Sequence, residues 1–176
     1  MPEKTKVVKV VPYNPDWKME FKKIKNKILK YIGNLILSVE HVGSTSVEGL
    51  AAKPIIDIDV VIEDMSVLPD IIKGLEKAGY EYEGNLGIEG REAFRRIKKD
   101  GLMKHHLYVC PKDGKGYLEH IALRDYLREN KDARREYEEL KLKLARKYRN
   151  DVDTYCIKKT DFINSILSKT IYKKQD

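Results

Sequence analysis

PIIDIDVVI, residues 54–62, predicts a strand with an unusual feature, because two aspartates interrupt an apolar run. Aspartate is depleted from strands. Side chains alternate between the two faces of a strand, so Asp57 and Asp59 share one face, with Cα atoms about 6.5–7 Å apart. Two neighbouring carboxylates repel each other unless a cation lies between them, and Mg²⁺ prefers such oxygen ligands together with substrate phosphates. We therefore expect Asp57 and Asp59 to bind Mg²⁺ or Mn²⁺; the alternative is a strand whose acidic face is simply solvated.

The turn Gly43–Ser46, with the sequence GSTS, lies upstream and follows an expected strand at 35–42. Small residues in such a turn let backbone N–H groups approach a phosphate, and the N-terminus of a following helix favours its negative charge. The hydroxyl of Ser44 or Thr45 would add a donor. A Gly-Ser turn alone is equally typical of an ordinary helix N-cap. Because Asp57 follows Ser44 by thirteen residues, the two features together indicate phosphate and metal sites on adjacent strand ends, as nucleotidyl transfer requires.

The rest of the chain predicts helices around a sheet. A cap and a proline at 14–15 begin the first helix, and Gly33 ends it. Apolar spacing and turn residues predict strands around 35–42, 55–62, 80–83, 93–99 and 105–110, and helices around 47–53, 66–78 and from 117 onward. The fold class is therefore α/β (α+β), a mixed sheet of about five strands with flanking helices. We expect a single domain over 1–176, with the sheet at about 35–110 and C-terminal helices at about 117–170 packed on it.

Composition excludes several classes of protein. Hydrophobic residues make up 41% and charged residues 36% of the chain, which is typical of a globular protein. The longest uninterrupted apolar run has four residues, far short of the roughly 20 that a transmembrane helix needs. No apolar stretch follows the N-terminal charges, so we expect no secretory signal. Cys110 and Cys156 fit no metal or redox motif, and we expect unpaired thiols in the cytoplasm.

The net charge of +7 is concentrated in the last third of the chain. From Arg124 onward, 15 Lys and Arg face 10 Asp and Glu, which gives +5. Such a segment is compatible with binding RNA or another polyanion. The interleaved acids favour the simpler interpretation, which is helices with solvated, lysine-rich faces.

Residues 40–59, EHVGSTSVEGLAAKPIIDID, closely resemble the GrpB family. The segments YNPDW at 13–17, REAFR at 91–95, HLYV at 106–109 and LRDYLR at 123–128 fit the same family, so the resemblance covers nearly the whole chain. It implies a nucleotidyltransferase-like fold, with the Gly-Ser turn and the Asp-x-Asp strand in the relation typical of that superfamily. It does not imply a particular reaction.

Active nucleotidyltransferases generally carry a third carboxylate on a later strand. Here Glu119 and Asp125 are the candidates, while the strand at 105–110 offers only His106 on the face that could align with the aspartates. We therefore add His106 to Asp57 and Asp59 as a catalytic candidate. His41 points either at the phosphate region or at an ordinary hydrogen-bond partner.

Four cations are the candidates for contact with phosphate oxygens: Lys53, Arg91, Arg95 and Arg124. Arginine would give a forked, bidentate contact, and lysine a point charge. For Arg124 the alternative is a structural ion pair with Asp125.

The sequence thus predicts a Mg²⁺-dependent nucleotide-binding protein that transfers a nucleoside monophosphate from a nucleoside triphosphate to an acceptor. The alternative is a catalytically silent module of the same fold that binds RNA or a protein partner through its basic C-terminal helices.

Overall fold

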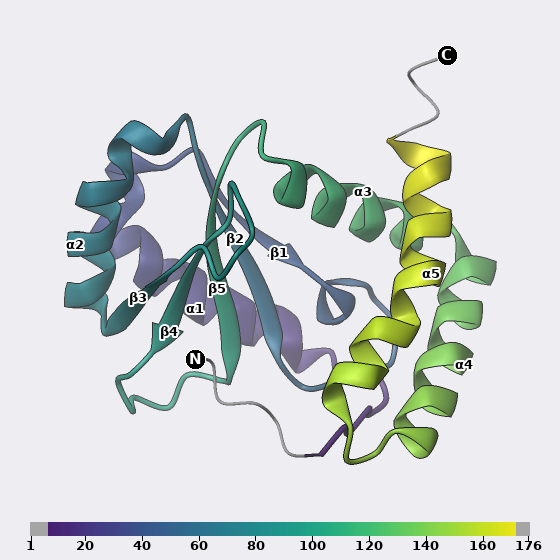
Figure 1. Cartoon of the computed structure of the whole chain (residues 1–176). Coiled ribbons are helices and arrows are strands. Elements are labelled where there is room, and N and C mark those ends of the chain that lie inside the picture. The colour runs from purple at the N-terminus through teal and green to yellow at the C-terminus, as the bar shows by residue number, and fades with distance from the viewer. Residues whose placement is uncertain (1–6, 172–176) are drawn as a thin grey trace.

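A mixed five-stranded sheet lies at the centre of the molecule, with the strand order β1-β2-β5-β4-β3 (Figure 1). The structure is a computed structural model and describes residues 7–171. The strands are β1 (Ser38–Val42), β2 (Ile56–Ile62), β3 (Tyr80–Gly84), β4 (Glu92–Arg96) and β5 (His105–Pro111). Strands β2 and β5 are parallel, and the other neighbouring pairs are antiparallel. The predicted fold class is confirmed.

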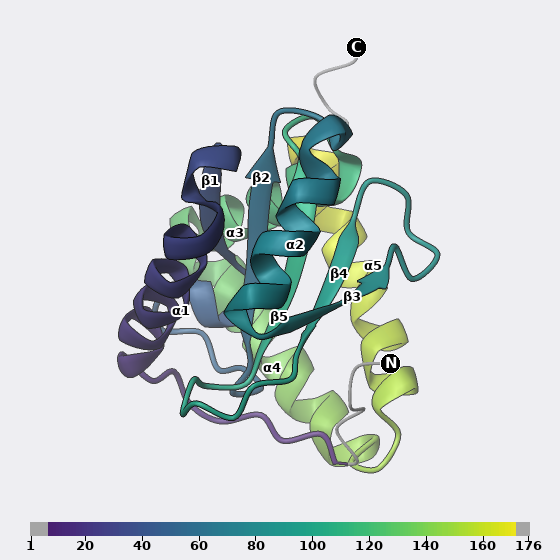
Figure 2. The ribbon, with the colours of Figure 1, turned by 90° about the vertical axis from the view of Figure 1, so that its left-hand side faces the viewer.

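Helices α1 (Asp16–Ile32) and α2 (Leu68–Ala78) cover one face of this sheet (Figure 2). Each helix presents an apolar stripe, and these stripes form the main core with the alternate residues of β2. Residues Ile24, Ile56 and Ile58 are fully buried there. Because the isoleucines of β2 take this face, its aspartates lie on the other one.

Three C-terminal helices lie on the opposite side of the sheet (Figure 1). They are α3 (Lys115–Glu129), α4 (Lys131–Lys147) and α5 (Val152–Thr170). A second buried cluster joins these helices to the segment between β1 and β2. Its buried members are Val47, Leu50, Leu127, Tyr137 and Ile166.

The segment between β1 and β2 differs from the prediction. The expected helix at 47–53 is wrong, since the chain forms one 3₁₀ turn at Ser44–Ser46 and then continues as irregular backbone. Gly49 has a φ of +81°, and Lys53 precedes a proline, which disfavours helical backbone. The packing of Val47 and Leu50 against the C-terminal helices therefore shapes this segment.

Both cysteines are free. Cys110 is buried in β5, where burial raises the pKa of its thiol to about 12. Cys156 is exposed. Within residues 7–171, no helix has the length and apolar character needed to cross a bilayer.

Candidate functional site

The acidic face of β2 carries two aspartates in different environments. Asp57 lies in register with His106 of β5, and Asp59 with Glu40 of β1. The side chain of Asp57 is 34% exposed, whereas that of Asp59 is fully buried. Ligands can therefore reach Asp57 directly, while Asp59 is enclosed by protein.

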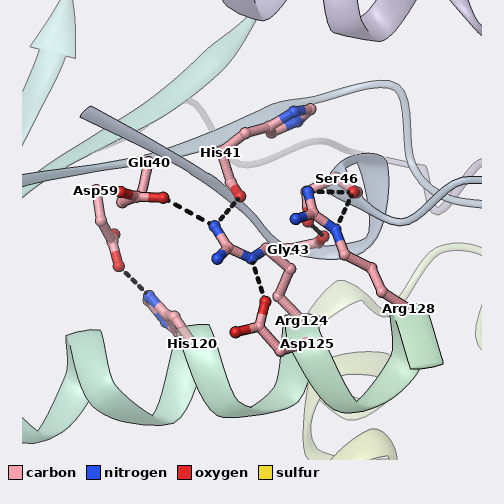
Figure 3. Close-up of polar contacts among 9 residues, drawn as sticks. All are labelled: Glu40, His41, Gly43, Ser46, Asp59, His120, Arg124, Asp125 and Arg128. Atoms are coloured by element: carbon pink, nitrogen blue, oxygen red, sulfur yellow. Dashed lines mark hydrogen bonds and ion pairs between the residues drawn. The ribbon is translucent and has the colours of Figure 1, made fainter. Parts of the chain in front are cut away.

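Asp59 is bound to helix α3 through His120 (Figure 3). His120 Nδ1 lies 2.7 Å from Asp59 Oδ2. The other oxygen, Oδ1, is buried and has no hydrogen-bond partner among the described residues. Burial acts to lower the pKa of His120, but the hydrogen bond to Asp59 and the negative charges of Asp59 and Asp57 raise it above the ordinary value of 6.5. This pair was not predicted from the sequence.

Asp57 is held between β5 and the Gly-Ser turn. His106 Nδ1 lies 2.9 Å from Asp57 Oδ1. On the other side, Gly43 has a φ of +73°, and a Cβ atom there would overlap the Asp57 carboxylate. Glycine is therefore required twice at this position, for its backbone conformation and for the close approach of the turn to Asp57.

Asp57 lines two cavities, which also share Ser44 and Lys159. The first, here called the arginine cavity, measures about 290 Å³. The second, here called the lysine cavity, measures about 140 Å³. Charged, polar and apolar side chains line the arginine cavity, among them Arg91, Tyr108, His120, Leu123, Arg124, Leu127 and Ile163. Basic and aromatic side chains line the lysine cavity, among them Lys53, His106, Lys141 and Tyr155.

Helix α3 contacts the site through side chains spaced by four residues, so that they share one face of the helix. These are His120, Arg124 and Arg128 (Figure 3). Arg128 donates from Nε and Nη2 to the Ser46 carbonyl at 3.0 and 2.8 Å. Arg128 thereby fixes the end of the Gly-Ser turn. This role was not predicted from the sequence.

Arg124 lines the arginine cavity and also joins α3 to the sheet (Figure 3). Its Nη1 donates to Glu40 Oε2 at 2.9 Å and to the His41 carbonyl at 3.2 Å, and its Nε donates to Asp125 Oδ1 at 2.9 Å. The ion pair with Asp125, expected as the alternative role, is thus present. Its place in the cavity wall leaves a contact with a bound anion open to test.

The other predicted phosphate ligands are only partly brought together. Arg91 stacks over the Tyr108 ring at 4.3 Å and lines the arginine cavity, and Lys53 lines the lysine cavity. Arg95 lines neither of these cavities. It forms an ion pair with Glu81 and lines a separate cavity over β4 and β5.

The Gly-Ser turn uses its two candidate hydroxyls differently. Ser44 lines both cavities at Asp57. Thr45 is buried, and its hydroxyl shares a 2.9 Å hydrogen bond with His41 Nε2. The His41 ring in turn stacks on Phe21, with centroids 4.7 Å apart, and burial lowers its pKa to about 4. His41 therefore has the structural role that we weighed as the alternative.

On the acidic face, β5 presents no carboxylate next to the aspartates, because His106, Tyr108 and Cys110 are in register with β2 there. The other neighbouring strand, β1, places Glu40 in register with Asp59, but Glu40 is ion-paired with Arg124. Glu119, a predicted candidate for the third carboxylate, lies on α3, where its Oε1 is 3.8 Å from Lys115 Nζ. Within residues 7–171, no three His, Cys, Asp or Glu side chains are grouped so as to hold a metal. Asp57 is therefore the residue that could hold a metal, with a bound ligand supplying further oxygens.

The sheet, the Gly-Ser turn and the Asp-x-Asp strand together define a protein of nucleotidyltransferase-like fold. The crystal structure of an H336N mutant of Cid1 poly(U) polymerase bound to MgATP is similar, with a TM-score of 0.56 and 11% sequence identity. The similarity covers 78% of this chain and 43% of the polymerase. At this level of identity the likeness concerns the fold.

The chain belongs to the GrpB family. The family model described as GrpB protein matches residues 7–169. The chain is 38% identical over 166 residues to the glutamate-rich protein GrpB of Alkalihalophilus pseudofirmus, covering 91% of this chain and 94% of that protein. It is also similar to the crystal structure of the conserved protein GrpB from Enterococcus faecalis, with 35% identity and a TM-score of 0.82. That match covers 96% of this chain and 100% of the other.

Proposed function

We propose that this protein binds a nucleoside triphosphate and Mg²⁺ at Asp57 and transfers the nucleoside monophosphate to an acceptor. The observation that carries the proposal is the contact between the Gly43 turn and the Asp57 carboxylate, at the point where the two cavities share their walls. A glycine turn that lies this close to an accessible carboxylate suits a phosphate bound together with a metal.

The charges around Asp57 support this proposal. Five cationic side chains line the two cavities: Arg91 and Arg124 in the first, Lys53 and Lys141 in the second, and Lys159 in both. Among residues 7–171, Asp57 is the one carboxylate in either lining, and Arg124 is already paired with Glu40 and Asp125, so four cations are left for a ligand. A triphosphate brings several negative charges and would balance this excess. The apolar wall of the arginine cavity, including Leu123 and Leu127, suits the nucleoside.

The residues present fit a magnesium ion shared with a ligand. Mg²⁺ is usually held by one or two carboxylates plus phosphates and water, so a closed cage of protein ligands is not required. Asp57 is accessible and would hold that ion, and the Oδ1 of Asp59, on the same face of β2, is buried without a hydrogen-bond partner among the described residues. When bound, Mg²⁺ neutralises charge on the transferring phosphoryl group and orients it. We assign to His106 the orientation of Asp57, to which it is hydrogen-bonded.

A silent site is the second candidate, and the side chains of β5 favour it. That strand presents His106 and Tyr108, not an acid, next to the aspartates, so the site would bind a nucleotide without turnover. The basic helices support RNA binding less than their net charge suggests. Arg124, Lys141 and Lys159 line the cavities, and Lys141 is buried.

Thermal unfolding with each nucleoside triphosphate, with and without Mg²⁺, tests the proposal. A ligand at 100 times its Kd adds about 2.7 kcal/mol, which is roughly 5–11 °C in midpoint for a chain of this length. We expect a Mg²⁺-dependent shift in the wild type that Asp57→Asn abolishes. Asp132→Asn, at an α4 side chain that is 98% exposed, is the matched control and should keep the shift.

Turnover is then measured as release of pyrophosphate from the nucleotide with the largest shift, in the presence of a cell extract that supplies acceptor hydroxyls. If no nucleotide shifts the midpoint, or if Asp57→Asn keeps the full shift, nucleotide binding at this site is wrong. Binding without pyrophosphate release supports the silent site. RNA binding that weakens steeply with salt and is indifferent to Asp57→Asn supports the module with an RNA partner.

A further inference from the structure

The lysine cavity gathers three lysines from three separate parts of the chain. Lys53 lies just before β2, Lys141 on α4 and Lys159 on α5. Lys141 is 1% exposed and donates a hydrogen bond to the carbonyl of Ala51. Among residues 7–171, none of the three forms an ion pair with a carboxylate.

Aromatic rings lie beside all three amines, and one of them, Tyr155, lines the cavity itself. The amines of Lys53 and Lys159 lie over the Tyr155 ring, 5.5 and 4.6 Å from its centroid. Lys141 lies 4.7 Å from the centroid of Tyr137. Cation–π contacts attract a cation without neutralising it. The positive charge of these amines is therefore still uncompensated and attracts an anion.

Such an arrangement is costly for a folded protein. Burial foremost, and then the neighbouring charge of Lys159, lower the pKa of Lys141 to about 7. Burial foremost, and then the charge of Lys53, lower the pKa of Lys159 as well. Buried charges are normally paired, and strongly perturbed groups in a cavity are typical of functional sites. Of the residues that the structure describes, Asp57, at the boundary of the cavity, is the single carboxylate in its lining.

We infer that the lysine cavity binds the terminal diphosphate of a nucleoside triphosphate, and free inorganic pyrophosphate in the same way. Each ammonium group offers three donors, and lysine binds phosphate as a point charge. A diphosphate carries several negative charges on the oxygens of two adjacent phosphate groups, so it can contact all three amines at once. A single carboxylate, with one charge, cannot neutralise three amines. Ser44 and Asp57 lie between this cavity and the arginine cavity, so the phosphate next to the nucleoside would lie at the Gly-Ser turn.

The inference deepens the proposed function, since it selects triphosphates over monophosphates, but its test needs no nucleotide. The probe is inorganic pyrophosphate, titrated by calorimetry in Mg²⁺-free buffer at fixed ionic strength. We expect saturable binding to the wild type and a Kd raised roughly tenfold to hundredfold in Lys159→Met, because a charge-assisted hydrogen bond is lost. Lys158→Met, at the exposed neighbour on α5, is the matched control and should bind like the wild type.

Asp57→Asn separates this inference from the proposed function. It should leave pyrophosphate binding unchanged or tighter, because a nearby negative charge is removed, although it abolishes the Mg²⁺-dependent nucleotide shift. Lys53→Met, at the rim of the cavity, provides a second variant should Lys159→Met lower the unfolding midpoint. The inference is overturned if the wild type does not bind pyrophosphate, if both lysine variants bind it like the wild type, or if equimolar sulfate displaces it equally well. None of these outcomes changes the Mg²⁺-dependent nucleotide shift of the wild type or its loss in Asp57→Asn. The inference can therefore fail while the proposed function stands.

Discussion

Replacing Lys141 with methionine should stabilise the fold near pH 7 and weaken pyrophosphate binding in the lysine cavity. Lys141 is 1% exposed, and methionine fills a similar volume without a charge. Burial acts most strongly on the amine. The positive charges of Lys159 and Lys53 act in the same direction, against the weaker attraction of Glu138. Opposite effects on stability and binding are typical of a residue that is kept for function.

The magnitude follows from the pKa of Lys141, which lies at about 7 in the folded protein against an ordinary 10.5. At about 1.36 kcal/mol per pH unit, and with half of the folded amine already neutral at pH 7, the buried charge costs about 4 kcal/mol of stability at that pH. Methionine removes that cost but leaves the Ala51 carbonyl without its hydrogen bond, which costs about 1–3 kcal/mol. The net gain is about 2 kcal/mol, or roughly 4–8 °C in the unfolding midpoint.

The sign of the pH dependence is fixed by proton binding. Between pH 7 and 10.5 the unfolded chain binds a proton at Lys141 that the folded chain does not, so this group makes wild-type stability rise with pH in that window. The advantage of Lys141→Met should therefore be largest at pH 7 and below, and small near pH 10.5. Chemical denaturation of both proteins at pH 7 and pH 10 measures it.

Lys143→Met, at an exposed position on the same helix, is the control and should change little at either pH. The reasoning is refuted if Lys141→Met is less stable than the wild type at pH 7, or if its advantage is equal at both pH values. It is also refuted if the variant is stabilised but binds pyrophosphate as the wild type does, since the buried charge would then serve no anion.

Two further predictions concern the frame around the aspartates. His120→Gln breaks the buried pair with Asp59 and should cost about 3–5 kcal/mol by urea denaturation. Because the folded pKa of His120 is raised, the loss should be full below pH 6.5 and shrink as pH rises through that pKa; a loss that is independent of pH contradicts this. Gly43→Ala places a Cβ on the Asp57 carboxylate, at φ +73° and ψ −177°, a backbone region essentially confined to glycine, which costs about 1–3 kcal/mol. It should also abolish the Mg²⁺-dependent nucleotide shift, and an unchanged shift would count against the role of the turn.

The sequence predicted the elements whose apolar pattern is local. The isoleucines of 54–62 alternate, and the structure places them against α1 and α2 as the buried face of β2. The segment 47–53 was predicted as a helix because its residues allow one. Its conformation depends instead on Val47 and Leu50, which pack against helices more than 70 residues further along the chain. Local pattern carries no information about such packing.

The sequence predicted which residues form the candidate site, but not which of them are exposed to a ligand. Alternation places Asp57 and Asp59 on one face, yet the position of α3 decides that Asp59 is buried and Asp57 is not. The lysines of the second cavity left a weak signal. Lys141 follows Tyr137 by four residues and therefore lies on the buried stripe of α4, where a charged residue is out of place.

The spacing of polar residues on α3 connects these observations. His120, Arg124 and Arg128 repeat every four residues and contact Asp59, Glu40 and the Ser46 carbonyl respectively (Figure 3). One helix face thus holds β2, β1 and the Gly-Ser turn at once. Because α4 and α5 follow α3 and pack with it, the same contacts set the distance between the lysines and Asp57. Asp59 is then best understood as the residue that anchors this frame, and Asp57 as the residue that meets the ligand.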